Sequence, residues 1–172
     1  MKDREGANVD YKASYKKAYE DVFSKAVDVN NLYGEQNYLR YLPLDNIALR
    51  LFPGDTLEQA EMVVQAAKTC KVPVTVSADI DNELADKLTG CKVVKESLNQ
   101  FIDGIAGYER IRTCSPDIDM SLYEAAAYAN KYVATAPPVK EGRVELTHYI
   151  KEQSVSYEYH RYGSITDVPP IE

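Results

Sequence analysis

Short apolar runs alternate with helix-like segments between residues 47 and 138, and this rhythm constrains the fold more than any other feature of the chain. Each helix-like segment repeats its apolar residues every three or four positions. The strand-like runs cover 47–52, 72–77, 92–95, 109–113 and 131–134. Strands that alternate with helices at this spacing form a mainly parallel sheet covered on both faces. The sequence therefore predicts a single α/β core.

The expected core is a degenerate Rossmann-like wrap of about five strands with helices on both faces. Its first helix is predicted to begin at Asp55 or Thr56, with Glu58 completing a capping box to Asp55. A short helix over 81–88 is expected to end at Gly90, and the next helix to open at Ser97. One more helix is predicted around residue 122.

The ends of the chain extend this core. Residues 1–10 have the composition of a linker or a tag remnant, and residues 11–32 are assigned to an N-terminal helix with one apolar stripe. Residues 33–172 make up the Rossmann-like domain. A helix is expected from about Arg143, with Val144, Leu146, Tyr149 and Ile150 on one face.

Two segments rich in tyrosine and arginine fall outside the rhythm, at about 37–42 and 154–162. They are predicted to pair as a two-stranded antiparallel ribbon, or β-flap, which must pack against something else to be stable. Aromatic rings with charges are typical of interfaces, although an edge strand blunted by charge is the plainer alternative. The candidate interface residues are Tyr38, Arg40, Tyr41, Tyr157, Tyr159, His160, Arg161 and Tyr162.

Three motifs carry a resemblance to a known family. They are 34–43 (GEQNYLRYLP), 109–112 (ERIR) and a long C-terminal set formed by 142–146, Tyr149, 152–154, Ser156 and 159–163. In this order they resemble the C-terminal region of the long proline utilisation A proteins. Those proteins are bifunctional proline dehydrogenases and pyrroline-5-carboxylate dehydrogenases. The region follows the catalytic domain and resembles an aldehyde dehydrogenase cofactor domain that no longer binds cofactor.

The resemblance implies a non-catalytic domain that acts in oligomerisation and covers the active site of an oxidoreductase of proline catabolism. It implies no cofactor in this chain, with NAD and FAD expected in the parent enzyme. The implied partner is an aldehyde dehydrogenase catalytic domain, in cis or in trans, and a homo-oligomer is compatible with it. The chain is then an excised piece or a separately encoded subunit.

The composition limits the classes of partner that the chain is expected to bind. The net charge of −7, from 27 acidic and 20 basic residues, argues against nucleic acid and anionic membranes. No apolar run approaches the ~20 residues of a membrane-spanning helix. Three widely spaced cysteines, Cys70, Cys91 and Cys114, indicate free thiols in a reducing cytoplasm.

The sequence offers few candidates for a cofactor site, a metal site or catalytic residues. The first strand-to-helix turn, 52–56 (FPGDT), has one glycine and lacks G-x-G-x-x-G, so NAD binding is not expected. His148 and His160 have no companion ligands for a metal, and Asp117 and Asp119 suit a helix start. No catalytic residue is assigned. The rival interpretation is an autonomous Rossmann-like small-molecule-binding domain or enzyme, and an adaptor is a weaker third.

Overall fold

A five-stranded parallel sheet lies at the centre of the structure, a computed structural model that describes residues 10–161 and 164–165. Its strands are β3 (Ile47–Arg50), β4 (Val74–Ala78), β5 (Lys92–Lys95), β6 (Arg110–Arg112) and β7 (Tyr132–Ala134). They are ordered β5-β4-β3-β6-β7, so the chain starts in the middle and winds outward in both directions. In order of sequence this is 3-2-1-4-5, the order of the first five strands of a Rossmann fold, and the predicted α/β fold is confirmed.

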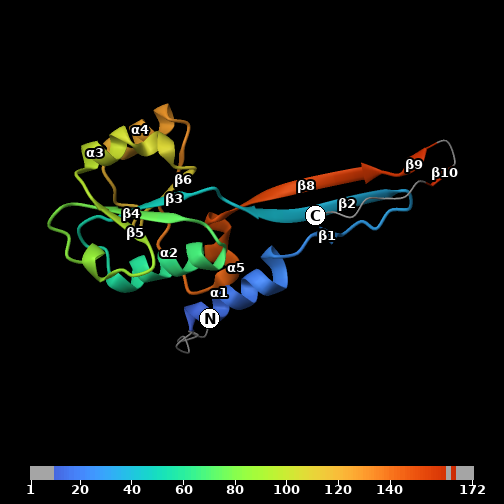
Figure 1. Ribbon diagram of the computed structural model, residues 1–172, viewed down its shortest axis with the longest axis horizontal. Helices are drawn as coiled ribbons and strands as arrows, with labels where there is room; N and C mark the ends of the chain where they lie inside the picture. The colour runs from blue at the N-terminus through green and yellow to red at the C-terminus, as the bar shows by residue number, and fades with distance from the viewer. Residues whose placement is uncertain (1–9, 162–163, 166–172) are drawn as a thin grey trace, which may run out of the picture.

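Helices cover both faces of this sheet (Figure 1). One face carries α2 (Leu57–Thr69), the short 3₁₀ turn η2 (Ala85–Lys87) and the larger buried cluster. The other face carries α3 (Leu98–Asp103), η3 (Ile105–Gly107) and α4 (Met120–Tyr128). A smaller cluster that includes Phe101, Ile111 and Leu122 fills that side.

Two predictions about helix starts are wrong. The helix expected over 81–88 is only the 3₁₀ turn η2, which begins at Ala85. Thr56 is the N-cap of α2 and forms its capping box with Gln59, so the predicted box between Asp55 and Glu58 is wrong. The Asp55 carboxylate instead accepts a hydrogen bond from the Phe52 amide. Ser97 caps α3 as predicted.

The N-terminal helix is shorter than predicted. It comprises α1 (Tyr11–Ala18) and the π-helical η1 (Tyr19–Phe23), and it ends well before residue 32. The next element is the strand β1 (Val27–Asp28), which pairs with Leu39 and Tyr38 of the strand β2 (Glu35–Pro43). The prediction failed because β pairing of 27–28 outweighs the continuation of the helical stripe.

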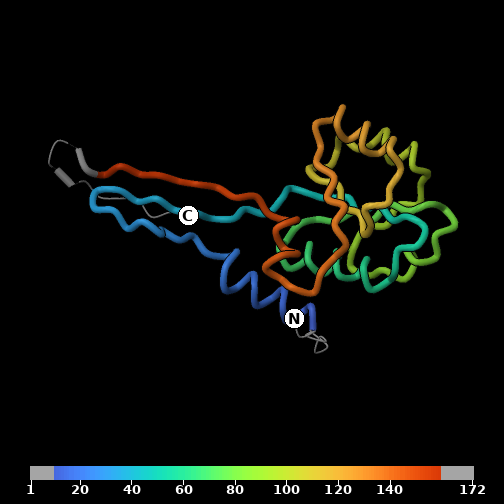
Figure 2. Tube along the Cα trace, turned by 180° about the vertical axis from the view of Figure 1, so that it is seen from behind, coloured from blue at the N-terminus to red at the C-terminus, as the bar shows by residue number. Residues whose placement is uncertain are grey.

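A twisted antiparallel sheet projects from the five-stranded unit (Figures 1 and 2). Its order is β1-β2-β8, with β2 (Glu35–Pro43) and β8 (Ile150–Glu158) in register along their whole lengths. We call residues 27–43 and 150–158 the arm, and the rest of residues 10–149 the body. The predicted ribbon is confirmed, and β1 adds a third strand that the sequence analysis missed. The short strands β9 (His160–Arg161) and β10 (Ser164–Ile165) pair with each other.

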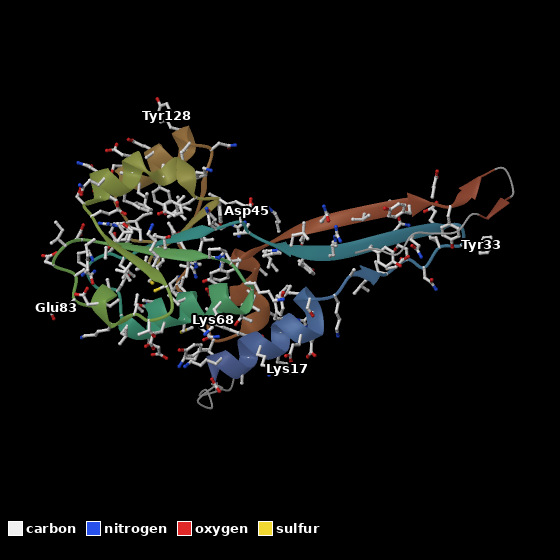
Figure 3. The ribbon with its side chains drawn as sticks, viewed as in Figure 1. Lys17, Tyr33, Asp45, Lys68, Glu83 and Tyr128 are labelled. Carbon is white, nitrogen blue, oxygen red and sulfur yellow. The ribbon has the colours of Figure 1, made fainter. Side chains whose placement is uncertain are left out.

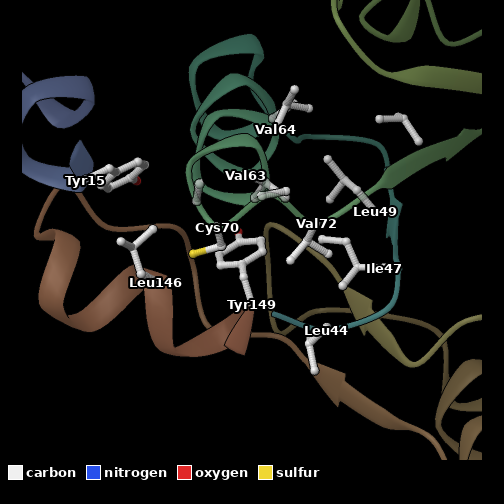
Figure 4. Close-up of a cluster of buried hydrophobic side chains, with 14 of the residues drawn as sticks. Tyr15, Leu44, Ile47, Leu49, Val63, Val64, Cys70, Val72, Leu146 and Tyr149 are labelled. Atoms are coloured by element: carbon white, nitrogen blue, oxygen red, sulfur yellow. The ribbon is translucent and has the colours of Figure 1, made fainter. Parts of the chain in front are cut away.

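The helix before β8 is also shorter than expected. It consists of α5 (Gly142–Glu145) and the 3₁₀ turn η4 (Leu146–His148). Tyr149 is the C-cap residue and Ile150 begins the strand, so the expected helical face ending at Ile150 is wrong. The ring of Tyr149 lies in the larger core cluster near Leu44, Val72 and Cys70 (Figure 4).

Candidate docking surface and sheet switch point

One face of the arm brings together three of the predicted interface residues. The register places Tyr38 opposite Val155, Arg40 opposite Gln153 and Gln36 opposite Tyr157, and paired residues share a face. The Arg40 Nε donates a hydrogen bond to Gln153 Oε1 at 2.6 Å. Tyr157 is 41% exposed. Tyr38, Arg40 and Tyr157 therefore lie on a common face.

Tyr41 lies on the opposite face, because side chains alternate along a strand. Its ring meets Phe23 edge to face, with the centroids 5.0 Å apart, and it packs against the core. Tyr41 thus joins the arm to the body. Tyr159 follows β8, and its amide donates to the Gly34 carbonyl at 3.0 Å.

The remaining predicted residues can be placed only in part. His160 and Arg161 form the backbone of β9. Their side chains, and Tyr162 as a whole, lie outside the described part of the chain. Their role in docking stays a prediction.

An exposed apolar tip was missed by the sequence analysis. Val27, Val29, Leu32 and Tyr33 are 45%, 74%, 50% and 81% exposed, and Tyr33 lies at the far end of the arm (Figure 3). The Asp28 carboxylate accepts hydrogen bonds from the amides of residues 30, 31 and 37, which folds the chain back into β2. These bonds lower the pKa of Asp28. The alternating Val-Asp-Val before two asparagines was the available signal.

A buried polar network fixes α5 and β8 to the body. Arg112 Nη2 and Glu145 Oε1 are 3.1 Å apart, and both side chains are at most 1% exposed. The Tyr149 hydroxyl donates to Glu145 Oε1 at 2.8 Å, and the Val139 amide donates to Oε2 at 3.0 Å. Burial, together with the adjacent Glu145 charge, raises the pKa of Tyr149 well above its usual value. The anchor of the arm is thus a charged pair inside the core.

Contacts nearer the surface reinforce this anchor. Arg110 Nη1 donates to the His148 carbonyl at 2.7 Å, and Lys151 Nζ donates to Glu109 Oε1 at 2.9 Å. The short 109–112 motif therefore contacts residues between 145 and 151, of which Glu145 belongs to the C-terminal motif. Burial and the neighbouring arginines lower the pKa of His148.

The second candidate site is the switch point of the parallel sheet, where a Rossmann fold places its nucleotide. A cavity of about 230 Å³ lies there, lined by residues that include Gly54, Asp55 and Cys114. The Asp55 carboxylate accepts the Phe52 amide hydrogen at 2.8 Å, and burial raises its pKa. Gln59 already accepts the Thr56 amide hydrogen at the start of α2. The loop thus directs a carboxylate, rather than open amides, to the position of a phosphate.

The described residues give little support for a metal site or a reactive cysteine. Within them, no three His, Cys, Asp or Glu side chains could hold a metal ion together. The three cysteines are free, and burial raises the pKa of Cys70 and Cys114 to about 12. Thiols with such values stay protonated and unreactive near neutral pH. In residues 10–161 and 164–165 no helix combines the length and apolarity needed to cross a membrane.

Comparisons with known proteins agree with this architecture. Neither a family model nor a curated protein matches the chain. Among solved structures, proline utilisation A (PutA) from Corynebacterium freiburgense matches 92% of the chain at 26% identity, with a TM-score of 0.63. The matched part is 14% of that larger protein.

Two further structures show the same fold at lower identity. Histidinol dehydrogenase from Elizabethkingia anophelis matches 73% of the chain and 34% of its own length, at 11% identity and a TM-score of 0.57. Staphylococcus aureus AldH, in a substrate-bound state, matches 72% of the chain and 30% of its own, at 14% identity and a TM-score of 0.50. The chain therefore resembles one part of the larger PutA protein, and it shares its fold with one part of histidinol dehydrogenase and of AldH.

Proposed function

We propose that this chain is the non-catalytic C-terminal domain of a cytoplasmic, proline-catabolic pyrroline-5-carboxylate dehydrogenase. In this proposal its arm covers the active site of the aldehyde dehydrogenase catalytic domain, as part of one polypeptide or as a subunit. The observation that carries the proposal is the arm itself. It projects from the body, it is built from two of the three recognised motifs, and the match to the PutA structure extends over 92% of the chain.

The surface chemistry of the arm supports docking. Its tip exposes Val29, Leu32 and Tyr33, and its face presents Tyr38 and Tyr157. Exposed apolar groups that extend away from a core are characteristic of interaction sites, and tyrosine is enriched among residues that dominate interface energies. The arm therefore has the composition of a surface that another protein covers.

A lid of this kind has a clear chemical use. Oxidation of an aldehyde to a carboxylate by NAD consumes one water molecule, so a useful cover excludes bulk solvent and still admits the reacting water. Exclusion of bulk solvent strengthens the electrostatic interactions inside the site, and the cover retains the aldehyde there. In this proposal the chain supplies the cover, while NAD, FAD and the reacting groups belong to the parent enzyme.

The test is reconstitution with a pyrroline-5-carboxylate dehydrogenase that lacks its own C-terminal domain. We expect the chain to co-sediment with that enzyme and to raise its rate of aldehyde oxidation. The substitution Tyr33→Ser should weaken both effects. The matched control is Tyr128→Ser, which removes a 96% exposed tyrosine from α4 on the body. Absence of complex formation, or equal loss in both variants, would contradict the proposal.

The rival function is an autonomous Rossmann-like small-molecule-binding domain or enzyme, and its site would be the cavity at Asp55. We expect calorimetric titration of the isolated chain with NAD to give no binding, because Asp55 opposes a phosphate there. Micromolar binding would favour the rival. It would also remove the assignment of a non-catalytic domain.

A further inference from the structure

Two glutamates lie directly opposite each other at the outer end of the arm. Glu35 of β2 pairs with Glu158 of β8 in the antiparallel register, so both side chains lie on the same face of the sheet. The Cβ atoms of directly opposed residues are about 4.5–5.5 Å apart, and like charges at this separation destabilise a sheet. The arm therefore carries an unfavourable pair of charges at a position where an uncharged or basic residue would be more stable.

The described residues supply no counter-ion for this pair. None of the ion pairs within residues 10–161 and 164–165 includes Glu35 or Glu158. Glu35 accepts a hydrogen bond from Asn37 Nδ2 at 3.1 Å, and the Ser156 hydroxyl donates to Asn37 Oδ1 at 2.8 Å. These neighbours are uncharged, so the two negative charges stay uncompensated within the described part of the chain.

Protection of a sheet edge explains only one of the two glutamates. Strand β8 is an edge strand, and a charge on an edge strand discourages pairing with another sheet. That effect accounts for Glu158. Glu35 belongs to β2, the central strand of the order β1-β2-β8, so its position opposite Glu158 needs a different explanation.

A hollow and an exposed apolar side chain adjoin the pair. The hollow has a volume of about 440 Å³, and the residues that line it are Glu35, Asn37, Ser156, Tyr157 and Glu158. Val27 is 45% exposed and pairs with Leu39, which lies four residues after Glu35, so all three share one face. This is the face of Tyr41, opposite to that of Tyr38. The surface thus combines two carboxylates with an apolar group.

We infer that the Glu35/Glu158 pair binds a basic side chain, lysine or arginine, that the aldehyde dehydrogenase catalytic domain presents to the arm. This inference rests on the proposed function and adds the chemistry of the contact. A cation between two carboxylates forms charge-assisted hydrogen bonds with both and removes their mutual repulsion. Complementary charges at an interface also fix the orientation of the partners. The arm then meets its partner with the Glu35 face as well as with the Tyr38 face.

The test is the affinity of the full 172-residue chain for a pyrroline-5-carboxylate dehydrogenase that lacks its own C-terminal domain, measured by calorimetric titration. Glu158→Lys places an ammonium group opposite Glu35 and thus supplies the cation from within the chain. We expect this variant to bind the enzyme about tenfold more weakly. The isolated variant should have a thermal midpoint no lower than that of the wild-type chain, because an opposite-charge pair replaces a like-charge pair.

The control is Glu83→Lys, which makes the same change of charge at an exposed position of the body, far from the arm (Figure 3). It should leave the affinity unchanged. If the wild-type chain binds and Glu158→Lys binds as tightly as Glu83→Lys, this inference is overturned and the proposed function stands. If the wild-type chain does not bind, both are overturned.

Two measurements on the isolated chain complete the test. A lower thermal midpoint for Glu158→Lys would overturn the inference, because it would show that the two glutamates do not repel each other. Sedimentation tests whether a second copy of the chain supplies the cation. Self-association of the wild-type chain that Glu158→Lys abolishes would assign the contact to that second copy and overturn its assignment to the catalytic domain.

Discussion

The body and the arm are stabilised in different ways. All four residues of β3 in the body are buried, whereas no residue of β2 in the arm is. Parallel strands are covered on both faces by their crossover helices, whereas an antiparallel ribbon can leave a face to solvent. The body thus contains its own core, while the arm depends on its attachment and on whatever covers it.

The attachment is the point where the two regions can be separated experimentally. Arg112 belongs to the body, Glu145 to α5, and Tyr149 immediately precedes the arm. Close packing of Gly142 on α1 completes the junction. Changes here should disturb the whole domain, and changes farther along the arm should affect only docking.

Glu145→Ala should have the largest effect. It leaves the Arg112 guanidinium buried without its ionic partner, which typically costs about 3–5 kcal/mol. The measurement is the free energy of unfolding from chemical denaturation. Glu124→Ala, at an exposed position of α4, is the control and should change stability by less than about 0.5 kcal/mol. Similar values for the two variants would show that the network does not anchor α5.

Gly142→Ala should have the second-largest effect. A Cβ at Gly142 would lie 2.5 Å from the Ser14 carbonyl oxygen and 2.8 Å from the Ala18 Cβ, so α1 must move. Overpacking of this kind costs about 1–3 kcal/mol. Gly107→Ala is the matched control, because a Cβ there meets no atom within 4 Å. Equal thermal midpoints for the two variants would rule out the close approach of α1 and α5.

The pH dependence of stability should reveal His148 at the same junction. Its pKa is lowered in the folded chain by burial and by Arg112 and Arg110. The unfolded chain therefore binds a proton first as the pH falls through about 6.5, and stability is lost below that value. The thermal midpoint should decrease less between pH 7 and pH 5.5 in His148→Gln. An identical decrease in both proteins would exclude His148 as the cause.

Substitutions on the arm face and tip should have the smallest effect on the isolated chain. Tyr33→Ser and Tyr157→Ser replace side chains that are 81% and 41% exposed, so each should change stability by less than about 0.5 kcal/mol. Calorimetry of the isolated variants measures this. A large loss of stability would mean that these tyrosines belong to a core and are not available for docking.

Local patterns were sufficient to predict the body. Strand β5 was predicted with its observed bounds, and Ser97 was identified as a helix cap, because both depend on neighbouring residues. Periodicity could not predict that Arg50 and Arg112 are buried, since their partners Asp79 and Glu145 lie about 30 positions away. The burial of these two arginines depends on pairing with residues that are distant in the sequence.

The arm was predicted only in outline for the same reason. The tyrosines and arginines of 37–42 and 154–162 indicated a ribbon, and β2 does pair with β8. The extra strand β1 overlaps a helical repeat, and only its pairing with β2 reveals it. The spacing of residues in the sequence predicts a surface only when all residues of that surface come from one helix or strand.

Amide hydrogen exchange, measured on the isolated chain and on its complex with a pyrroline-5-carboxylate dehydrogenase that lacks its own C-terminal domain, tests the account most directly. In the isolated chain, protection should be high in β3, β4 and α2 and low in the arm, because local opening follows the amount of buried contact. In the complex, protection should rise in β2 and β8 and stay constant in the body. Unchanged protection in the arm, or an increase confined to α3 and α4, would contradict the proposal that the arm is the docking element.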